Sequence, residues 1–130
     1  MPTAAIIGGG VIGSAWASRF LLNGWEVRFH DPAPNSEAVL NKVLDKARRW
    51  VPEVYDRLPA EGTLTLCTSI ADAVSGADWV QESTPERLEI KQPVLAEIQA
   101  SCASKAIVAS STSGFMPAEL QAGSALPEQI

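Results

Sequence analysis

The sequence predicts an α/β domain of the doubly wound (Rossmann-type) class, in which helices cover both faces of a mainly parallel sheet. Strand-like and helix-like segments alternate along all 130 residues, which is the pattern of successive βαβ units. A glycine-rich turn directly follows the first strand-like segment, and an acidic residue ends the second. The length is that of a single domain, so residues 1–130 are interpreted as one unit.

The first helix is indicated by a change in the spacing of the apolar residues. Residues 3–8 form a short apolar run that ends in glycines, as buried strands do. From residue 11 to residue 23, Ile12, Trp16 and Phe20 recur every four positions, which places them on one face of a helix. Gly24 follows as a helix stop, and residues 25–30 form the second strand-like segment.

The remaining segments continue the alternation. Residues 36–50 have the spacing of an amphipathic helix, with Asn35 or Ser36 as its N-cap, and Pro52 is expected to end or kink it. Residues 63–68, 79–83 and 106–109 are strand-like. Helices are expected over residues 70–74, 90–102 and 116–121, and Pro93 lies inside the second of these.

The segment Gly8-Gly9-Gly10-Val11-Ile12-Gly13 has the residue types that a nucleotide diphosphate needs at a strand-to-helix turn. Gly8 permits the tight turn, Gly10 leaves room for the diphosphate, and Gly13 lets the helix pack close to the strand. The helix N-terminus adds free N–H groups and a positive dipole end. Gly9 is interpreted as incidental. The motif alone also fits a turn whose glycines serve only packing, so its flanking strand, helix and acidic residue carry the assignment.

Asp31 ends the second strand-like segment and indicates which dinucleotide is bound. A carboxylate at this position accepts hydrogen bonds from the adenosine ribose hydroxyls and repels the 2′-phosphate of NADP. Pro32 and Ala33 follow, and neither can receive that phosphate as an Arg or Lys would. The sequence therefore predicts NAD as the cofactor.

Two polar clusters follow the fourth and fifth strand-like segments, at residues 81–87 and 110–114. In doubly wound sheets the carboxyl ends of the strands form the ligand-binding edge, so hydroxyls there can contact the nicotinamide ribose or a substrate oxygen. Simpler interpretations stay open: the serine run as a solvated loop, Glu86 as helix N-terminal charge, and Lys91 as a surface ion pair.

The composition argues against several classes of protein. The net charge of −5 and the scattered basic residues do not favour binding to nucleic acid or to an anionic membrane. No apolar run approaches the roughly 20 residues that span a bilayer, and no secretory signal is recognised, so a cytoplasmic location is expected. One histidine and two cysteines are too few for a zinc site, so no metal is expected.

Taken together, these motifs resemble the N-terminal NAD-binding domain of the 3-hydroxyacyl-CoA dehydrogenase family, and within it the L-carnitine dehydrogenases. The resemblance runs over most of the chain. It is carried by residues 6–14, 24–27 with Asp31-Pro32, 77–83 with Pro85-Glu86, and 107–114. The serine run at 110–114 is the most specific part, because the glycine loop is common to many families.

The resemblance implies a role for each matching residue. The glycine loop holds the diphosphate, and Asp31 the adenosine ribose. Glu86 and Lys91 contact the nicotinamide end of NAD, and Ser113 is the catalytic contact to the substrate hydroxyl. Ser111, also on the cofactor side, replaces an Asn of the fatty-acyl enzymes, which favours a carnitine-like branch. Pro93 departs from the family pattern and is expected to reset the helical turn that carries Lys91.

The family's catalytic histidine, the glutamate that orients it and the helical dimerisation domain have no counterpart in residues 1–130. We therefore expect the NAD-binding portion of a longer dehydrogenase, truncated before its last strands and inactive alone. Its parent would be a homodimeric oxidoreductase of fatty acid or carnitine metabolism that transfers a hydride from a small 3-hydroxy substrate, L-carnitine or a 3-hydroxyacyl-CoA, to NAD. Another β-hydroxyacid dehydrogenase and a non-catalytic NAD-binding module are the alternatives.

Overall fold

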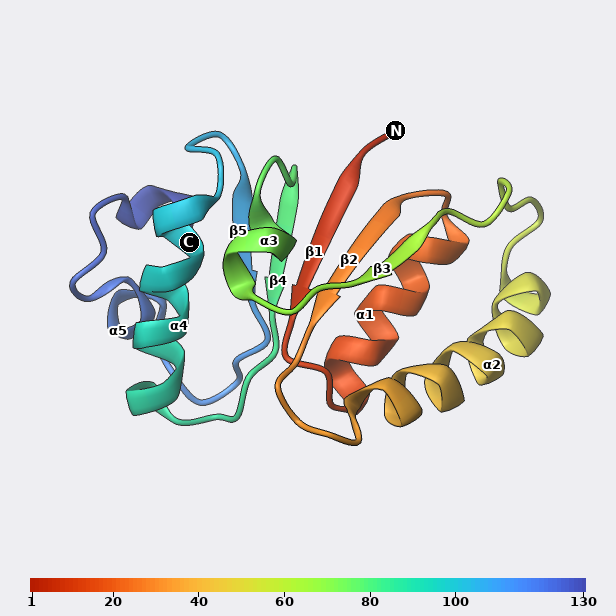
Figure 1. The fold of residues 1–130 in the computed structure, drawn as a ribbon, viewed down its shortest axis with the longest axis horizontal. Helices are drawn as coiled ribbons and strands as arrows, with labels where there is room; N and C mark the ends of the chain where they lie inside the picture. The colour runs from red at the N-terminus through yellow and green to blue at the C-terminus, as the bar shows by residue number, and fades with distance from the viewer.

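The computed structural model describes all residues, 1–130, and contains one five-stranded parallel sheet with the order β3-β2-β1-β4-β5 (Figure 1). The strands are β1 (Thr3–Ile7), β2 (Glu26–His30), β3 (Leu64–Leu66), β4 (Trp79–Glu82) and β5 (Ile107–Ser110). The helices are α1 (Val11–Leu22), α2 (Ser36–Val54), α3 (Ile70–Val74), α4 (Leu88–Ser101) and α5 (Pro117–Gln121), and the 3-10 helix η1 (Pro127–Gln129) ends the chain. The predicted doubly wound fold class is confirmed.

The sheet separates two hydrophobic cores. Because successive strand residues face opposite sides, Ile6 of β1 packs with α1 and α2, whereas Ile7 packs with α3, α4 and α5. In Figure 1 the pair α1 and α2 accordingly lies on one side of the sheet, and α4 and α5 lie on the other. The central strand β1 is buried along its whole length, as a strand covered on both faces must be.

The parallel register brings the carboxyl ends of four strands into one row. Ile7 of β1 pairs with His30 of β2 and with Glu82 of β4, and Glu82 pairs with Ser110 of β5. The residues that follow these strands therefore leave the sheet at one edge; they are Gly8, Asp31, Ser83 and Ser111. The chain runs outward from β1 in both directions, so this edge is the topological switch point at which such sheets bind ligands.

Neither Pro52 nor Pro93 ends its helix. α2 does not end at Pro52 but continues to Val54, and α4 runs through Pro93 from Leu88 to Ser101. The turn before Pro93 keeps helical bonding, because the main-chain N–H of Lys91 donates to the carbonyl of Arg87 at 2.9 Å. Each proline removes only one N–H from a helix held by packing of its other residues. The expected resetting of this turn is therefore wrong.

The predicted face of α1 is only partly buried: Trp16 and Phe20 pack against the core, and the Phe20 ring centroid lies 6.1 Å from that of Trp79 on β4. Ile12 is 59 % exposed and lies on the same side as the half-buried Trp16 and Phe20. The residues that α1 buries are mostly small: Gly13, Ser14, Ala17, Ser18, Leu21 and Leu22. Small side chains let this helix approach the sheet closely. None of the helices is both long and apolar enough to cross a bilayer.

Candidate functional site

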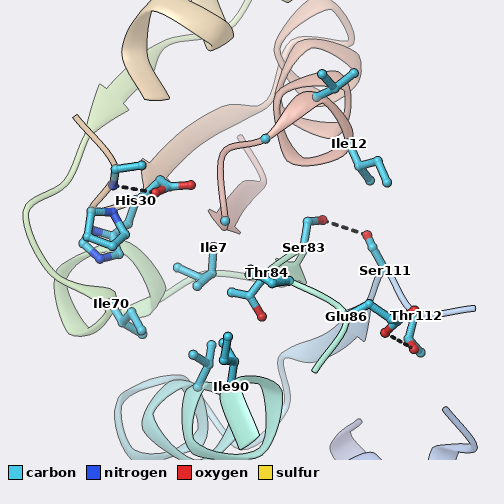
Figure 2. Close-up of a pocket in the computed structure, with 18 of the residues that line it drawn as sticks. Ile7, Ile12, His30, Ile70, Ser83, Thr84, Glu86, Ile90, Ser111 and Thr112 are labelled. Atoms are coloured by element: carbon cyan, nitrogen blue, oxygen red, sulfur yellow. Dashed lines mark hydrogen bonds between the residues drawn. The ribbon is translucent and has the colours of Figure 1, made fainter. Parts of the chain in front are cut away.

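A cleft of about 1260 Å³ lies over the row of strand ends at the switch point. Its walls come from the residues that follow β1, β2, β4 and β5, together with the first turn of α1. In Figure 2, His30 lies at one end of this cleft, and Glu86 and Thr112 lie at the other. The cleft is therefore elongated across the sheet edge, as an extended ligand requires.

Close main-chain contacts exclude side chains at Gly8 and Gly13 of the glycine loop. Gly8 has a φ of +99°, and a Cβ there would lie 2.6 Å from the carbonyl carbon of Ser83. A Cβ on Gly13 would lie 1.8 Å from the carbonyl oxygen of Gly8, so only glycine lets α1 begin here. Gly10 differs, because a Cβ there meets nothing within 4 Å. Its missing side chain leaves space open to the cleft.

Gly9 is required for packing, and its interpretation as incidental is wrong. A Cβ at this position would lie 2.3 Å from Cζ of Phe29 on β2. The Gly9 main-chain N–H also donates to Oδ2 of Asp31 at 2.5 Å. Gly9 does not line the cleft, so its contribution is to seat the loop against β2.

Asp31 lies on the wall of the cleft and is held by main-chain donors. Its Oδ2 accepts the Gly9 N–H, and its Oδ1 accepts the N–H of Ala33 at 2.7 Å. A carboxylate offers about four lone-pair sites, so two main-chain bonds leave acceptor capacity for ligand hydroxyls. The neighbouring His30 places Nδ1 3.0 Å from the carbonyl oxygen of Cys67, so that nitrogen carries the donated proton.

A buried ion pair lies beneath the other half of the cleft. Lys91 of α4 and Glu82 of β4 are both wholly buried, and Nζ lies 2.9 Å from Oε2 and 3.1 Å from Oε1. The third ammonium donor reaches the carbonyl oxygen of Thr84 at 3.0 Å, while the hydroxyls of Thr84 and Ser110 donate to Glu82. Each charge is thus fully hydrogen-bonded, which a buried pair needs.

This arrangement places Lys91 behind the wall of the cleft. The residue does not line the cleft, and all three of its donors already have partners inside the protein. Its ammonium therefore anchors the β4–α4 connection from below. The ion pair that Lys91 forms is buried, so the alternative interpretation of a surface ion pair is wrong, and a contact to the nicotinamide end stays a prediction.

Glu86 joins the two polar loops that follow β4 and β5. Its carboxylate accepts the main-chain N–H of Ser113 at 2.9 Å, the Thr112 hydroxyl at 2.7 Å and the N–H of Gly114 at 3.3 Å. These bonds favour the ionised form, so the Ser113 main chain and then the Thr112 hydroxyl lower the pKa of Glu86. The exposed Ser113 hydroxyl is a longer contact to the same oxygen, at 3.4 Å.

Most of the predicted residues meet in this one cleft. Its walls include Gly8, Gly10, Val11, Ile12, Asp31, Glu86, Ser111 and Ser113, whereas Gly9, Gly13 and Lys91 support the walls from behind. The apolar wall of Ile7, Ile70, Ile90 and Val94 was not predicted, because these residues look like core residues in the sequence. Ser83 and Thr84 also line the cleft, and they are the hydroxyl residues of the predicted polar cluster at 81–87.

The cleft has the features that a dinucleotide needs. The open position at Gly10 leaves room beside the N-terminus of α1, where no side chain caps the free N–H groups. Asp31 offers acceptors to ribose hydroxyls, and the apolar wall offers a surface for an aromatic base. The residues present therefore fit the group predicted from the sequence. No group of three or more His, Cys, Asp or Glu side chains is arranged to hold a metal ion.

Comparison with known proteins gives one family. Residues 3–130 match the model of the 3-hydroxyacyl-CoA dehydrogenase NAD-binding domain. A protein of Ruegeria pomeroyi named L-carnitine dehydrogenase/betainyl-CoA thioesterase is 55 % identical over 100 % of this chain, which spans 27 % of that relative. An L-carnitine dehydrogenase of Oceanobacillus iheyensis is 44 % identical over 100 % of the chain, which covers 43 % of its length. The chain thus spans about a quarter to two fifths of these relatives.

Solved structures share the fold at closely similar geometry. The NAD⁺-dependent 5-formyl-3-hydroxy-2-methylpyridine 4-carboxylic acid 5-dehydrogenase superposes with a TM-score of 0.88 at 36 % identity, over 99 % of this chain and 42 % of the other. The 3-hydroxybutyryl-CoA dehydrogenase of Escherichia coli superposes with a TM-score of 0.78 at 28 % identity. The match covers 98 % of this chain and 28 % of the other.

Proposed function

This chain belongs to the family of 3-hydroxyacyl-CoA dehydrogenase NAD-binding domains, and from that premise we propose that it holds NAD for hydride transfer from a 3-hydroxy substrate in a longer parent enzyme. The observation that carries the proposal is the row of strand ends. It brings the glycine loop, Asp31 and the Ser111–Ser113 loop into one elongated cleft. A dinucleotide is the ligand whose chemistry matches these parts in this order.

The adenosine half of NAD is assigned to the β2 side of the cleft. Asp31 accepts from the ribose hydroxyls there, and Ile70, Ile90 and Val94 contact the base. The diphosphate lies at Gly8 and Gly10, where the N-terminus of α1 offers free N–H groups. Val11 and Ile12 form the first turn of that helix and contact the same part of the ligand.

The nicotinamide half is assigned to the side where Glu86, Ser111 and Ser113 lie. When bound, NAD supplies the nicotinamide ring that accepts a hydride from the substrate's CH–OH carbon. Ser113 is exposed in the loop that Glu86 holds, and its hydroxyl is the proposed catalytic contact to the substrate oxygen. Lys91 acts indirectly, by holding the β4–α4 connection from which Glu86 reaches that loop.

The proton acceptor is assigned to the parent enzyme outside residues 1–130. The single histidine, His30, lies beside Asp31 at the adenosine end and directs Nδ1 to the Cys67 carbonyl. It is therefore far from the hydroxyl that must lose a proton. As implied by the family resemblance, a histidine of the parent takes that proton.

L-carnitine is the substrate we propose for the parent. The support is the set of relatives named L-carnitine dehydrogenase, with identities from 42 % to 55 %, against 28 % for the 3-hydroxybutyryl-CoA dehydrogenase. Ser111 in place of the fatty-acyl enzymes' Asn agrees with this choice. We further propose a cytoplasmic homodimeric parent with no nucleic-acid or membrane partner. The net charge of −5 favours that absence of anionic partners.

Calorimetric titration of the chain with NAD and with NADP tests the binding assignment. We expect NAD to bind more tightly, because Asp31 repels a 2′-phosphate. Asp31→Arg should reduce the ratio of NAD to NADP affinity by roughly tenfold or more. Asp56→Arg makes the same charge change at an exposed position that does not line the cleft, and it should leave the ratio unaltered. An Asp31→Arg variant with the wild-type ratio would contradict the assignment.

A further inference from the structure

Four side chains form a continuous hydrogen-bonded chain from β4 to the cleft. The Trp79 indole Nε1 lies 3.1 Å from Oε1 of Gln81, and Nε2 of Gln81 lies 3.0 Å from Oγ of Ser111. The Ser111 Oγ in turn lies 2.7 Å from the Ser83 Oγ, the contact drawn between these residues in Figure 2. Gln81 is only 2 % exposed, whereas both serines line the cleft.

The direction of this chain follows from the indole. An indole N–H only donates, so the Gln81 atom that faces Trp79 must be the carbonyl oxygen. The amide nitrogen of Gln81 therefore faces Ser111 and donates to its hydroxyl oxygen. One lone pair of the Ser111 Oγ is thereby occupied, and Gln81 takes no hydrogen from either serine.

A count of hydroxyl hydrogens then leaves one free. The two serines carry two hydroxyl hydrogens, and one of these forms the bond between them. No other protein atom accepts a hydrogen from the Oγ of Ser83 or of Ser111. Whichever serine donates to the other, exactly one O–H remains to be offered to a ligand in the cleft.

This donor lies beside the glycine loop. The main chain of Ser83 is the group that a Cβ on Gly8 would strike, at 2.6 Å from its carbonyl carbon. A Cβ on Gly13 would lie 3.5 Å from the Cβ of Ser83, so the serine pair borders the start of α1. The acceptor nearest to this place in a bound dinucleotide belongs to the diphosphate or to the ribose next to it.

We propose that Trp79, Gln81, Ser111 and Ser83 form a directional hydrogen-bond chain that presents a single O–H donor to an oxygen of the dinucleotide, on its diphosphate or its nicotinamide-side ribose. This inference rests on the proposed NAD function. The two serines are ligand contacts, and Gln81 and Trp79 are positioning residues that set the direction of the donor. This hydrogen-bond chain makes the cleft selective for a ligand with a hydrogen-bond acceptor next to the two serines.

Gln81→Glu tests the direction, because it changes a donor into an acceptor at nearly constant shape. At about pH 9 the introduced carboxylate is ionised, and it accepts the Ser111 hydrogen while still accepting from Trp79. Ser83 then donates to Ser111, and no O–H is left for the ligand. We expect NAD affinity to fall by roughly tenfold. Gln81→Met still leaves one serine O–H free for the ligand, so it should lower NAD affinity less than Gln81→Glu does.

Three controls separate this effect from general damage. AMP lies on the β2 side, so its affinity should be the same in the wild type and in Gln81→Glu. Gln92→Glu makes the same substitution in α4, where the amide donates to the Glu119 carbonyl, and it should leave NAD affinity unaltered. ADP-ribose should lose as much affinity as NAD in Gln81→Glu, because it retains both candidate acceptors.

The double variant Ser83→Ala/Ser111→Ala removes both hydroxyls without adding a buried charge, and it should weaken NAD by roughly tenfold as well. The inference is overturned if this double variant or Gln81→Glu binds NAD within about threefold of the wild type. It is also overturned if Gln81→Met lowers the affinity for NAD as much as Gln81→Glu does. The same holds if Gln81→Glu lowers the affinity for AMP as much as the affinity for NAD. No NAD binding by the wild-type chain would instead refute the proposed function itself.

Discussion

Gly10 and Gly13 stand three residues apart in one loop, yet a methyl group would meet opposite surroundings at the two positions. At Gly10 the nearest heavy atoms lie more than 4 Å away, and its φ of −69° is open to any residue. At Gly13 the Gly8 carbonyl oxygen lies at 1.8 Å. One glycine therefore leaves space for a ligand, and the other leaves space for the protein itself.

Alanine substitution should separate these two functions. We expect Gly13→Ala to reduce the free energy of unfolding by at least about 2 kcal/mol, because the loop must move to relieve the overlap. Gly10→Ala should cost no more than about 1 kcal/mol as an N-cap change, yet weaken NAD by roughly tenfold or more. Thermal melting and calorimetry measure the two effects. Equal loss of stability in both variants would contradict this division.

At this scale the sequence predicts the residues that act through a local motif. Gly8, Gly10, Gly13 and Asp31 follow from strand, turn and helix spacing alone. The role of Gly9 depends on Phe29 of β2, a tertiary contact that no local pattern contains. The burial of Lys91 likewise depends on its partner Glu82 on β4, a tertiary contact that the family resemblance that singled out Lys91 does not contain.

At the scale of the elements, Glu86 connects the turn before α4 with the loop after β5. Bonds from Ser113, Thr112 and Gly114 reach its carboxylate and lower its pKa. A carboxyl whose folded pKa is depressed adds stability above its unfolded pKa of about 4.3 and loses that stability as the pH falls through the folded value. The link between the loops is thus strongest near neutral pH.

Glu86→Gln should therefore lower the melting temperature most at about pH 7, and the deficit should shrink as the pH falls and the wild-type carboxyl becomes protonated. The difference in melting temperature between variant and wild type, measured at each pH, is the observable. Glu53→Gln changes an exposed carboxyl of α2 and serves as the matched control. A deficit that stays constant with pH would show that the ionised carboxylate is not what holds the loops.

Element order and type are well predicted, whereas faces and ends are not. The apolar period placed α1 and its Ile12–Trp16–Phe20 face, but that face is only partly buried, and the fully buried positions of the helix are mostly small residues. A prediction from hydropathy expects large apolar side chains on the buried face of a helix. Close packing of α1 against the sheet instead requires small residues such as Gly13 and Ala17. Both prolines lie inside helices because tertiary packing outweighs the loss of single hydrogen bonds.

At the scale of the whole molecule, the proposed binding of a cofactor is separable from its chemistry. The cleft collects acceptors and hydroxyls along one edge, but the only histidine is at the end that we assign to adenosine. A titration with NAD should show heat, and the same sample with NAD and L-carnitine should show no sustained formation of reduced nicotinamide. The full-length parent under the same conditions is the positive control. Steady turnover by the 130-residue chain would contradict this division of roles.

The central position of β1 has a further consequence, which concerns folding. Its pairing with β2 joins residues 23 positions apart, whereas its pairing with β4 joins Ala4 to Trp79. Closing the longer loop costs more chain entropy, so we expect the β1–α1–β2 unit to form before β4 docks. About half of the residues that line the cleft follow β4 and β5, so that half of the cleft forms only after β4 has docked on β1. Ligand binding therefore reports on the completed sheet, and NAD gives little protection to any partly folded intermediate.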